Sequence, residues 1–394
     1  MLDLIIQKKV QDFIAEYLNS DVQKLALKKN PFPELDYKII INQIISKNKA
    51  KEKLPTWFEA RGIIYPEKIS IEQTSSEKTA QYKAEIVSGT SLIDLTGGFG
   101  VDDYYFSKKI NNVVHCEINS NLSSLVNHNF KQLNVTNVAC FAGDSLDFLN
   151  STTQVFDWIY IDPSRRSSSK GKVFLLADCL PNVPELLDFY FTKSKNILIK
   201  MAPILDITSA LKELQFVKTV HIVSVNNEVK ELLFELEHNF SGSILLKTVD
   251  FGIKTHTFEA SFEEETPYLN FSLPKKYLYE PNSGLMKSGC FELISSRFNL
   301  SKLQTHSHIY TSDEIIDFPG RVFEIIEEFL YNKENMKKHF QNQQCNITTR
   351  NFPETVENIR KKWKIKDGGN QYCFFTTNIN NQKIVLLCTK IQQL

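Results

Sequence analysis

Short apolar segments alternate with helical segments through the middle of the chain, and this alternation limits the possible folds more than any other sequence feature. The apolar periodicity predicts short strands at residues 91–96, 113–118, 139–143, 156–161 and 196–201. Helices are expected before and between them, at residues 77–87, 101–109, 120–133 and 184–191. Strands joined by helical crossovers form a parallel sheet covered on both faces. Residues 219–225 and 231–237 are expected to close the sheet as a pair, so the pattern predicts a doubly wound α/β domain.

This alternation is confined to the middle of the chain. Residues 1–73 carry apolar side chains at helical spacing, interrupted by prolines, which predicts an N-terminal helical region. After about Glu265 the pattern changes to an α+β region, with helices expected at 321–331 and 354–363 and strands at 372–376 and 383–389. A chain of 394 residues is too long for one compact core. We therefore predict four domains, at residues 1–73, 74–265, 266–319 and 320–394.

Composition excludes several classes of protein. Lysine and arginine together number 46, as do aspartate and glutamate, so net charge gives no global argument for nucleic-acid binding. The seven cysteines include no Cys-x-x-Cys pair, which indicates reduced thiols. His306-x-His308 lacks an evident third ligand, so no metal site is expected. Without a signal-peptide pattern or a membrane-length apolar run, a cytoplasmic protein with no membrane association is expected.

A glycine-rich loop joins the first predicted strand to the helix that follows it. Its sequence, Asp94-Leu-Thr-Gly-Gly-Phe-Gly100, supplies the candidate cofactor-binding residues Asp94, Thr96, Gly97, Gly98 and Gly100. Glycines let the backbone pass close to a ligand, and the start of the helix adds free N–H groups. The simpler interpretation of the loop alone is a tight turn between strand and helix.

Acidic residues follow the next three predicted strands, where ligands of open α/β sheets bind. Glu117, with Ile118 beside it, is placed to accept hydrogen bonds from two ribose hydroxyls. Asp144 and Ser145 would lie at an adenine edge. Asp162 and Pro163 would face the reaction centre. Four acids at four strand ends favour a nucleoside-containing cofactor.

A nicotinamide cofactor is the main alternative for this loop. Its fingerprint requires a third small residue, but Gly100 is followed by Val101, Asp102 and Asp103. Acids at this helix start would oppose a pyrophosphate and would tolerate the positive charges of S-adenosylmethionine. The sequence therefore predicts S-adenosyl-L-methionine as the cofactor.

The segment after the fourth strand, Asp162-Pro163-Ser164-Arg165-Arg166, provides the candidate catalytic residues Asp162, Arg165 and Arg166. Methyltransferases that act on exocyclic amines often carry Asp/Asn-Pro-Pro-aromatic here, and Ser164-Arg165 departs from that pattern. The guanidinium groups instead suit phosphate or another anion. Lys200 either faces the same cleft or forms a salt bridge with a nearby acid.

Aromatic residues near this site allow two interpretations. The set could form a stacking surface for a ligand, although burial in the core is the commoner explanation for such side chains. The residues concerned are Trp57, Phe58, Phe99 and Tyr104.

Motifs spread over most of the chain resemble one family. Beside those above, they are Lys200-Met-Ala-Pro-Ile-Leu-Asp206, Tyr279-Glu-Pro-Asn282, Thr349-Arg-Asn-Phe-Pro353 and Lys364-Ile-Lys-Asp-Gly-Gly369. Together they resemble the class I S-adenosylmethionine-dependent methyltransferases that carry a THUMP-like C-terminal domain. The resemblance implies a ferredoxin-like subdomain at 266–319, a THUMP-like domain at 320–394 and, because THUMP domains proper bind RNA, an RNA substrate (tRNA or rRNA). A methyltransferase for a small molecule or protein, and a non-catalytic RNA-binding protein, are the alternatives.

Overall fold

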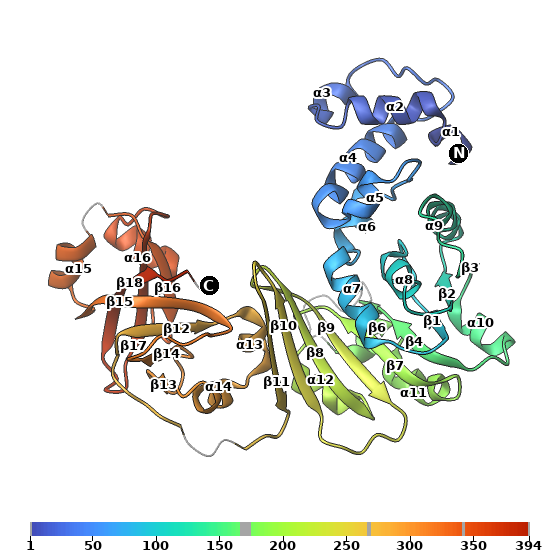
Figure 1. Ribbon diagram of the computed structural model, residues 1–394. Helices are drawn as coiled ribbons and strands as arrows, with labels where there is room; N and C mark the ends of the chain where they lie inside the picture. Colours follow the sequence, from blue (N-terminus) through green and yellow to red (C-terminus); the bar gives the residue numbers. More distant parts are fainter. Residues whose placement is uncertain (1, 166–174, 266–268, 341–342, 393–394) are drawn as a thin grey trace. The chain divides into compact units, whose positions relative to one another are not determined.

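A computed structural model describes residues 2–165, 175–265, 269–340 and 343–392. The chain divides into two compact units. The first contains residues up to Lys218 together with Leu232–Gly242, and the second contains Thr219–Glu231 and Ser243–Leu394. The chain therefore passes between the units more than once. Figure 1 labels the helices and strands.

The first unit begins with a series of helices. They are α1 (Leu2–Ile5), α2 (Lys8–Glu16), α3 (Val22–Ala26), α4 (Tyr37–Lys53), α5 (Pro55–Glu59), α6 (Lys68–Gln73) and α7 (Glu77–Ile86). Asp21 and Asp36 cap α3 and α4 by accepting backbone N–H groups, as N-cap acids commonly do. Ser76 caps α7 in the same way. A buried apolar cluster from α1 to α4 holds this helical region together.

A mostly parallel sheet forms the rest of the first unit. Its order is β9-β7-β4-β1-β2-β3, with β1 at Ser91–Asp94, β2 at Asn112–Glu117, β3 at Val138–Ala142, β4 at Phe156–Ile161 and β7 at Ser194–Met201. Strand β9 (Glu228–Glu237) pairs antiparallel with β7 through residues 232–237. The crossovers carry α8 (Val101–Phe106), α9 (Ser120–Gln132), α10 (Ser145–Ser151), α11 (Val183–Phe191) and α12 (Ile207–Glu213). The doubly wound α/β fold predicted from the sequence is confirmed.

The direction in which successive strands are added to the sheet reverses between β1 and β4, although the two strands are parallel. Strands β2 and β3 extend the sheet on one side of β1, whereas β4 and β7 extend it on the other. Such a switch point is where ligands bind in open α/β sheets. The topology alone therefore places a ligand site at the carboxyl ends of β1 and β4.

The second unit contains two groups of strands. In the first, β8 (Val217–Val225) pairs parallel with β10 (Leu245–Phe251), which pairs antiparallel with β11 (Thr255–Ser261). The second is a seven-stranded sheet in the order β13-β14-β12-β15-β18-β17-β16. Its strands are β12 (Tyr277–Pro281), β13 (Ser301–Lys302), β14 (Tyr310–Ser312), β15 (Gly320–Leu330), β16 (Asn346–Arg350), β17 (Gln371–Thr377) and β18 (Lys383–Lys390). The accompanying helices are α13 (Ser283–Ser288), α14 (Phe291–Arg297), α15 (Lys333–Phe340) and α16 (Val356–Trp363).

One sequence prediction in this unit is wrong. Residues 321–331 were expected to be a helix, but Gly320–Leu330 is strand β15, paired with β12 and β18. A β-bulge between Ile325 and Glu327 shifts the register within the strand. A bulge interrupts the alternation of side chains between the two faces, so the apolar residues fall at a spacing that resembles a helix.

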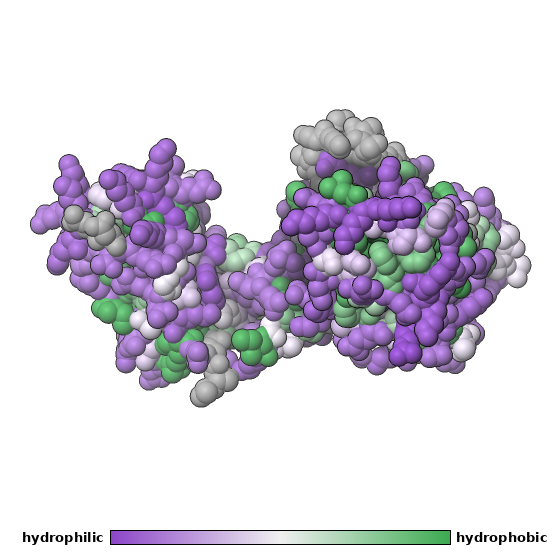
Figure 2. Space-filling view, turned by 90° about the horizontal axis from the view of Figure 1, so that it is seen from above, coloured by the Kyte–Doolittle hydropathy of each residue, from purple (hydrophilic) through white to green (hydrophobic). Residues whose placement is uncertain are grey.

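The surface is mainly polar. The space-filling view in Figure 2 shows hydrophilic residues over most of the visible face, with hydrophobic residues in small separate areas. Among the residues that the structure describes, no helix is long and apolar enough to cross a bilayer.

Candidate functional site

Backbone hydrogen bonds gather the carboxyl ends of four strands at one edge of the first unit's sheet. The N–H of Leu95 donates to the carbonyl of Tyr160 at 3.0 Å, which joins the ends of β1 and β4. The N–H of Gly97 donates to the carbonyl of Cys116 at 2.8 Å, and that of Gly143 to Glu117 at 3.0 Å. The four segments in which the sequence predicted cofactor-binding residues are therefore brought together.

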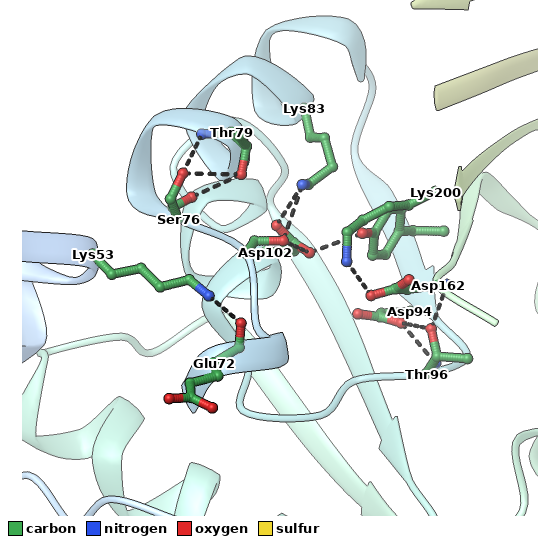
Figure 3. Close-up of polar contacts among 12 residues, drawn as sticks. Lys53, Glu72, Ser76, Thr79, Lys83, Asp94, Thr96, Asp102, Asp162 and Lys200 are labelled. Atoms are coloured by element: carbon green, nitrogen blue, oxygen red, sulfur yellow. Dashed lines mark hydrogen bonds and ion pairs between the residues drawn. The ribbon is translucent and has the colours of Figure 1, made fainter. Parts of the chain in front are cut away.

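The side chain of Asp94 supports the glycine-rich loop through hydrogen bonds. Its side chain is buried, and its Oδ1 accepts hydrogen bonds from the backbone N–H of Thr96 at 2.7 Å and from the hydroxyl of Thr96 at 3.2 Å. The Thr96 hydroxyl oxygen accepts the backbone N–H of Asp162 at 2.7 Å, so one side chain links the ends of β1 and β4 (Figure 3). Burial, followed by the nearby charge of Asp103, raises the pKa of Asp94 well above its usual range. Asp94 and Thr96 thus hold the shape of the loop.

The three glycines of the loop serve different purposes. A Cβ on Gly97 would lie 2.1 Å from Cε1 of the buried His115 ring. A Cβ on Gly100, whose φ is +74°, would lie 2.8 Å from side-chain atoms of Phe130 and Val126. Gly98 has a φ of +56° and faces open space, since its Cβ would approach only the carbonyl of Thr96 at 3.7 Å. Gly97 and Gly100 permit close packing, whereas Gly98 leaves room for a ligand.

Glu117 lies against this open part of the loop. Its Oε2 accepts the N–H of Gly98 at 3.0 Å, and its Oε1 accepts the N–H of Asn119 at 2.7 Å. Each oxygen of an ionised carboxylate has a further acceptor position. The neighbouring Ile118 side chain is 75 % exposed, which is unusual for an apolar residue at a strand end. Glu117 and Ile118 therefore offer two hydrogen-bond acceptors beside an exposed apolar side chain.

Asp144 occupies the end of β3 as predicted. Its side chain is exposed, and its Oδ1 accepts the N–H of Leu146 at 2.8 Å, which caps α10 at Ser145. This cap fixes the direction of the carboxylate.

The two acids at the start of α8, Asp102 and Asp103, do not have the role that the sequence argument gave them. Asp102 forms an ion pair with the fully buried Lys83 at 3.2 Å and accepts hydrogen bonds at 2.8 Å from the hydroxyls of Ser75 and Tyr160 (Figure 3). Burial opposes the charged form of Asp102, but the charges of Lys83 and Lys200 and the two hydroxyls together lower its pKa. Asp102 is therefore turned into the protein and would not repel a pyrophosphate.

Asp103 is fully buried and lies 2.7 Å from Nδ1 of His115. Burial lowers the pKa of His115 and raises that of Asp103. With both acids paired inside the protein, the sequence argument against a nicotinamide cofactor rests on the missing third small residue alone.

At the end of β4, Asp162 forms an ion pair with Lys200 of β7 (Figure 3). Of the two alternatives for Lys200, the salt bridge is the one observed. Pro163 is buried behind Asp162, and Arg165 is exposed in the two-residue strand β5 (Ser164–Arg165), which pairs with β6 (Cys179–Leu180). Arg166 lies outside the described residues.

The aromatic side chains near the loop belong to the core. Trp57 is fully buried and Phe99 is 4 % exposed. Their ring centroids are 6.3 Å apart, and that of Tyr104 lies 4.9 Å from Trp57. Burial, the commoner explanation for such residues, accounts for Trp57 and Phe99.

Three residues of the site were missed by the sequence analysis. Lys83 gives no signal, because a lysine in an amphipathic helix is usually exposed. Tyr160 resembles the other apolar residues of its strand. His115 could have been noticed, since it stands inside an otherwise apolar strand. Burying such a polar ring requires a partner, which Asp103 supplies.

One histidine of the His306-x-His308 pair takes part in packing in the second unit. The ring of His308 stacks on Phe291 with centroids 3.7 Å apart. Among the described residues, no group of three His, Cys, Asp or Glu side chains is placed to hold a metal ion.

His308 is expected to titrate far from the usual value for histidine. Burial, followed by the charges of Lys302 and Arg350, lowers its pKa from 6.5 to about 4. Between these values the unfolded chain binds more protons than the folded one, so this part of the stability is present above pH 6.5 and is lost as the pH falls towards 4. Following the imidazole resonance by NMR should give a midpoint near pH 4 in the folded protein and near 6.5 in urea. A folded-state midpoint at pH 6.5 would contradict the lowered pKa of His308.

The C-terminal region matches two family models. Residues 277–319 match a ferredoxin-like domain, and residues 320–390 match a domain described as THUMP domain-like. No curated protein matches the chain.

One solved structure is similar over the whole chain. It is the crystal structure of a "putative methyltransferase" from Porphyromonas gingivalis W83, with a TM-score of 0.88, 29 % identity and 99 % of each chain covered. Two others match a smaller part. An rRNA methylase from Streptococcus thermophilus has a TM-score of 0.30, 14 % identity and covers 41 % of this chain and 93 % of its own. TrmK from M. capricolum, solved with S-adenosyl-homocysteine, has a TM-score of 0.32, 15 % identity and covers 41 % and 68 %. These two similarities are too weak to support an argument about activity.

The fold, the site at the strand ends and the similarity over the whole chain together define a class I S-adenosylmethionine-dependent methyltransferase. More particularly, its C-terminal region carries a ferredoxin-like domain at residues 277–319 followed by a THUMP-like domain at residues 320–390.

Proposed function

We propose that this methyltransferase transfers a methyl group from S-adenosylmethionine to RNA in the cytoplasm. The observation that carries the proposal is the convergence of Gly98, Glu117 and Asp162 at the switch point of the sheet. When bound there, S-adenosylmethionine supplies an electrophilic methyl group for an in-line displacement, in which alignment provides much of the catalysis. The four domains at residues 1–73, 74–265, 266–319 and 320–394 remain part of this proposal.

Cofactor binding is assigned to the residues around the open part of the loop. The carboxylate of Glu117 would accept hydrogen bonds from the ribose hydroxyls, and the exposed Ile118 would lie against the adenine ring. Asp144 and Ser145 would contact the edge of the adenine. Asp94, Thr96, Gly97 and Gly100 would act through the backbone that they position.

Asp162 is assigned a positioning role at the reacting centre. Its carboxylate is held by the Lys200 ammonium, and its backbone N–H is held by Thr96. The ion pair restricts the directions in which the carboxylate can point. Asp162 therefore orients the acceptor by hydrogen bonding, with Pro163 packed behind it.

RNA as the acceptor is supported by the match of residues 320–390 to a THUMP-like model. The exposed Arg165 directly after the reaction centre adds a guanidinium suited to a phosphate oxygen, and we assign the same role to Arg166. RNA held by such contacts should dissociate as salt rises.

Mass spectrometry of nucleosides from total RNA tests the acceptor. A strain that lacks the gene should lose one methylated nucleoside relative to its parent, and a plasmid copy of the wild-type chain should restore it. A plasmid copy carrying Glu117→Ala should not restore it. An unchanged nucleoside profile would reject RNA and favour a small-molecule or protein acceptor.

Replacing Arg165 with alanine should weaken RNA binding about fivefold to tenfold, because one phosphate contact is lost. The slope of log affinity against log salt should fall by about one. Fluorescence anisotropy with labelled RNA measures both. Lys212→Ala removes the same charge from an exposed position on α12 and is the matched control. Equal effects of the two substitutions would show that Arg165 makes no specific contact.

A further inference from the structure

A cavity of about 270 Å³, partly open to solvent, lies in the second unit, where the ferredoxin-like and THUMP-like regions meet. Its lining comes from sequence segments far apart: Asn227, Glu280, Pro281, Ser283, Met286, Arg321 and Arg350. Two of the motifs noted in the sequence, Tyr279–Asn282 and Thr349–Pro353, thus contribute to one cavity. The proposed methyl transfer uses none of these residues.

Glu280 organises the two arginines of this cavity. Its carboxylate is 4 % exposed, and it forms ion pairs with the guanidinium groups of both Arg321 and Arg350. The Nε of Arg321 donates to Oε2 at 2.6 Å, and Nη2 of Arg350 donates to Oε1 at 2.9 Å. Glu280 and Arg321 lie opposite each other on the paired strands β12 and β15, whereas Arg350 comes from the end of β16. One carboxylate therefore fixes two guanidinium groups and neutralises only one of them.

One N–H donor of these two guanidinium groups has no acceptor among the described residues. The Nε of Arg350 is buried and has no hydrogen-bond partner among the described residues. A buried charged donor without an acceptor is costly, so such a group usually has a partner in the working state.

We propose that this cavity binds a phosphate group through Arg350 and Arg321, with Glu280 holding both side chains in position. Guanidinium groups match phosphate oxygens in geometry and charge. The phosphate belongs either to an RNA backbone or to a small phosphorylated molecule. The proposal does not depend on the methyl-transfer chemistry of the first unit.

The cavity is tested by binding measurements on the full chain. The first probe is a short labelled single-stranded RNA, whose binding is measured by fluorescence anisotropy. The second is inorganic phosphate, whose binding is measured by the broadening of its ³¹P NMR line. Arg350→Gln should weaken binding about tenfold, since a charge-assisted pair is lost. Glu280→Gln should also weaken it, by about threefold, because an amide has one acceptor oxygen and can hold only one of the two guanidinium groups. Lys361→Gln removes one exposed positive charge from α16 and is the matched control.

The outcomes separate the possible ligands. Loss of both RNA and phosphate binding in Arg350→Gln would identify an RNA phosphate. Loss of phosphate binding alone would identify a small phosphorylated molecule. If Arg350→Gln changes neither probe more than Lys361→Gln does, the proposal is overturned. S-adenosylmethionine binding by the same variants should equal that of the wild type, so failure of this proposal is distinguishable from failure of the proposed function.

Discussion

Gly97→Ala should destabilise the protein by about 3 kcal/mol or more, at the upper end of the cost of overpacking a core. The added methyl group would lie 2.1 Å from the imidazole ring of His115, which is fully buried and held by Asp103. The ring has little freedom to move aside, and the N–H of Gly97 is bonded to the carbonyl of Cys116. Urea denaturation monitored by circular dichroism measures the change in the free energy of unfolding.

Two comparisons identify the cause of this loss. Gly98→Ala introduces a methyl group into open space at a φ of +56°, so it should cost only about 1–2 kcal/mol of backbone strain. In a His115→Ala background the clash is absent, so adding Gly97→Ala should cost at least about 1 kcal/mol less than it does in the wild type. Equal costs of Gly97→Ala in the two backgrounds would contradict the described packing of the loop.

Glu117→Ala should weaken binding of S-adenosylmethionine about 100-fold or more. Hydrogen bonds to a charged group contribute about 1.5–3 kcal/mol each, and two ribose hydroxyls would lose their acceptor. The substitution also releases the N–H of Gly98, so the open part of the loop loses its support. Equilibrium dialysis with labelled cofactor gives the two dissociation constants.

The controls separate loss of the ligand contact from loss of charge. Asp147→Ala removes an exposed acid from the first turn of α10 and should leave the affinity for the cofactor unchanged. Glu117→Gln keeps one acceptor oxygen and should bind with intermediate affinity. An affinity of Glu117→Ala within twofold of the wild type would remove Glu117 from the cofactor site.

The sheet was predictable because each of its strands is a short apolar run between turns. The predicted strand 156–161 matches β4, and the predicted strand 113–118 differs from β2 by one residue at each end. The bulged strand β15 was not predictable, because a local change of register leaves no distinct mark in the sequence. Strands such as β13, with two residues, are too short to produce a periodic pattern.

The positions of the site residues were predictable from topology, but their partners were not. Since the carboxyl ends of parallel strands meet at one edge, Asp94, Glu117 and Asp162 had to lie near one another. Which acid turns inward depends on packing between elements far apart in the chain. Asp102, for instance, is paired with Lys83, which stands on a helix that precedes the sheet. The charged residues of the cavity in the second unit come from three separate strands, and although two of these segments stood out as motifs, nothing in the sequence brought them together.

Titration calorimetry of the wild-type chain of 394 residues with S-adenosylmethionine tests the central claim most directly. We predict saturable binding at one site per chain, abolished or strongly weakened by Glu117→Ala and unaffected by Asp147→Ala. The same titration with NAD should give no binding. A folded wild-type protein that binds NAD, or that binds no S-adenosylmethionine, would contradict the account.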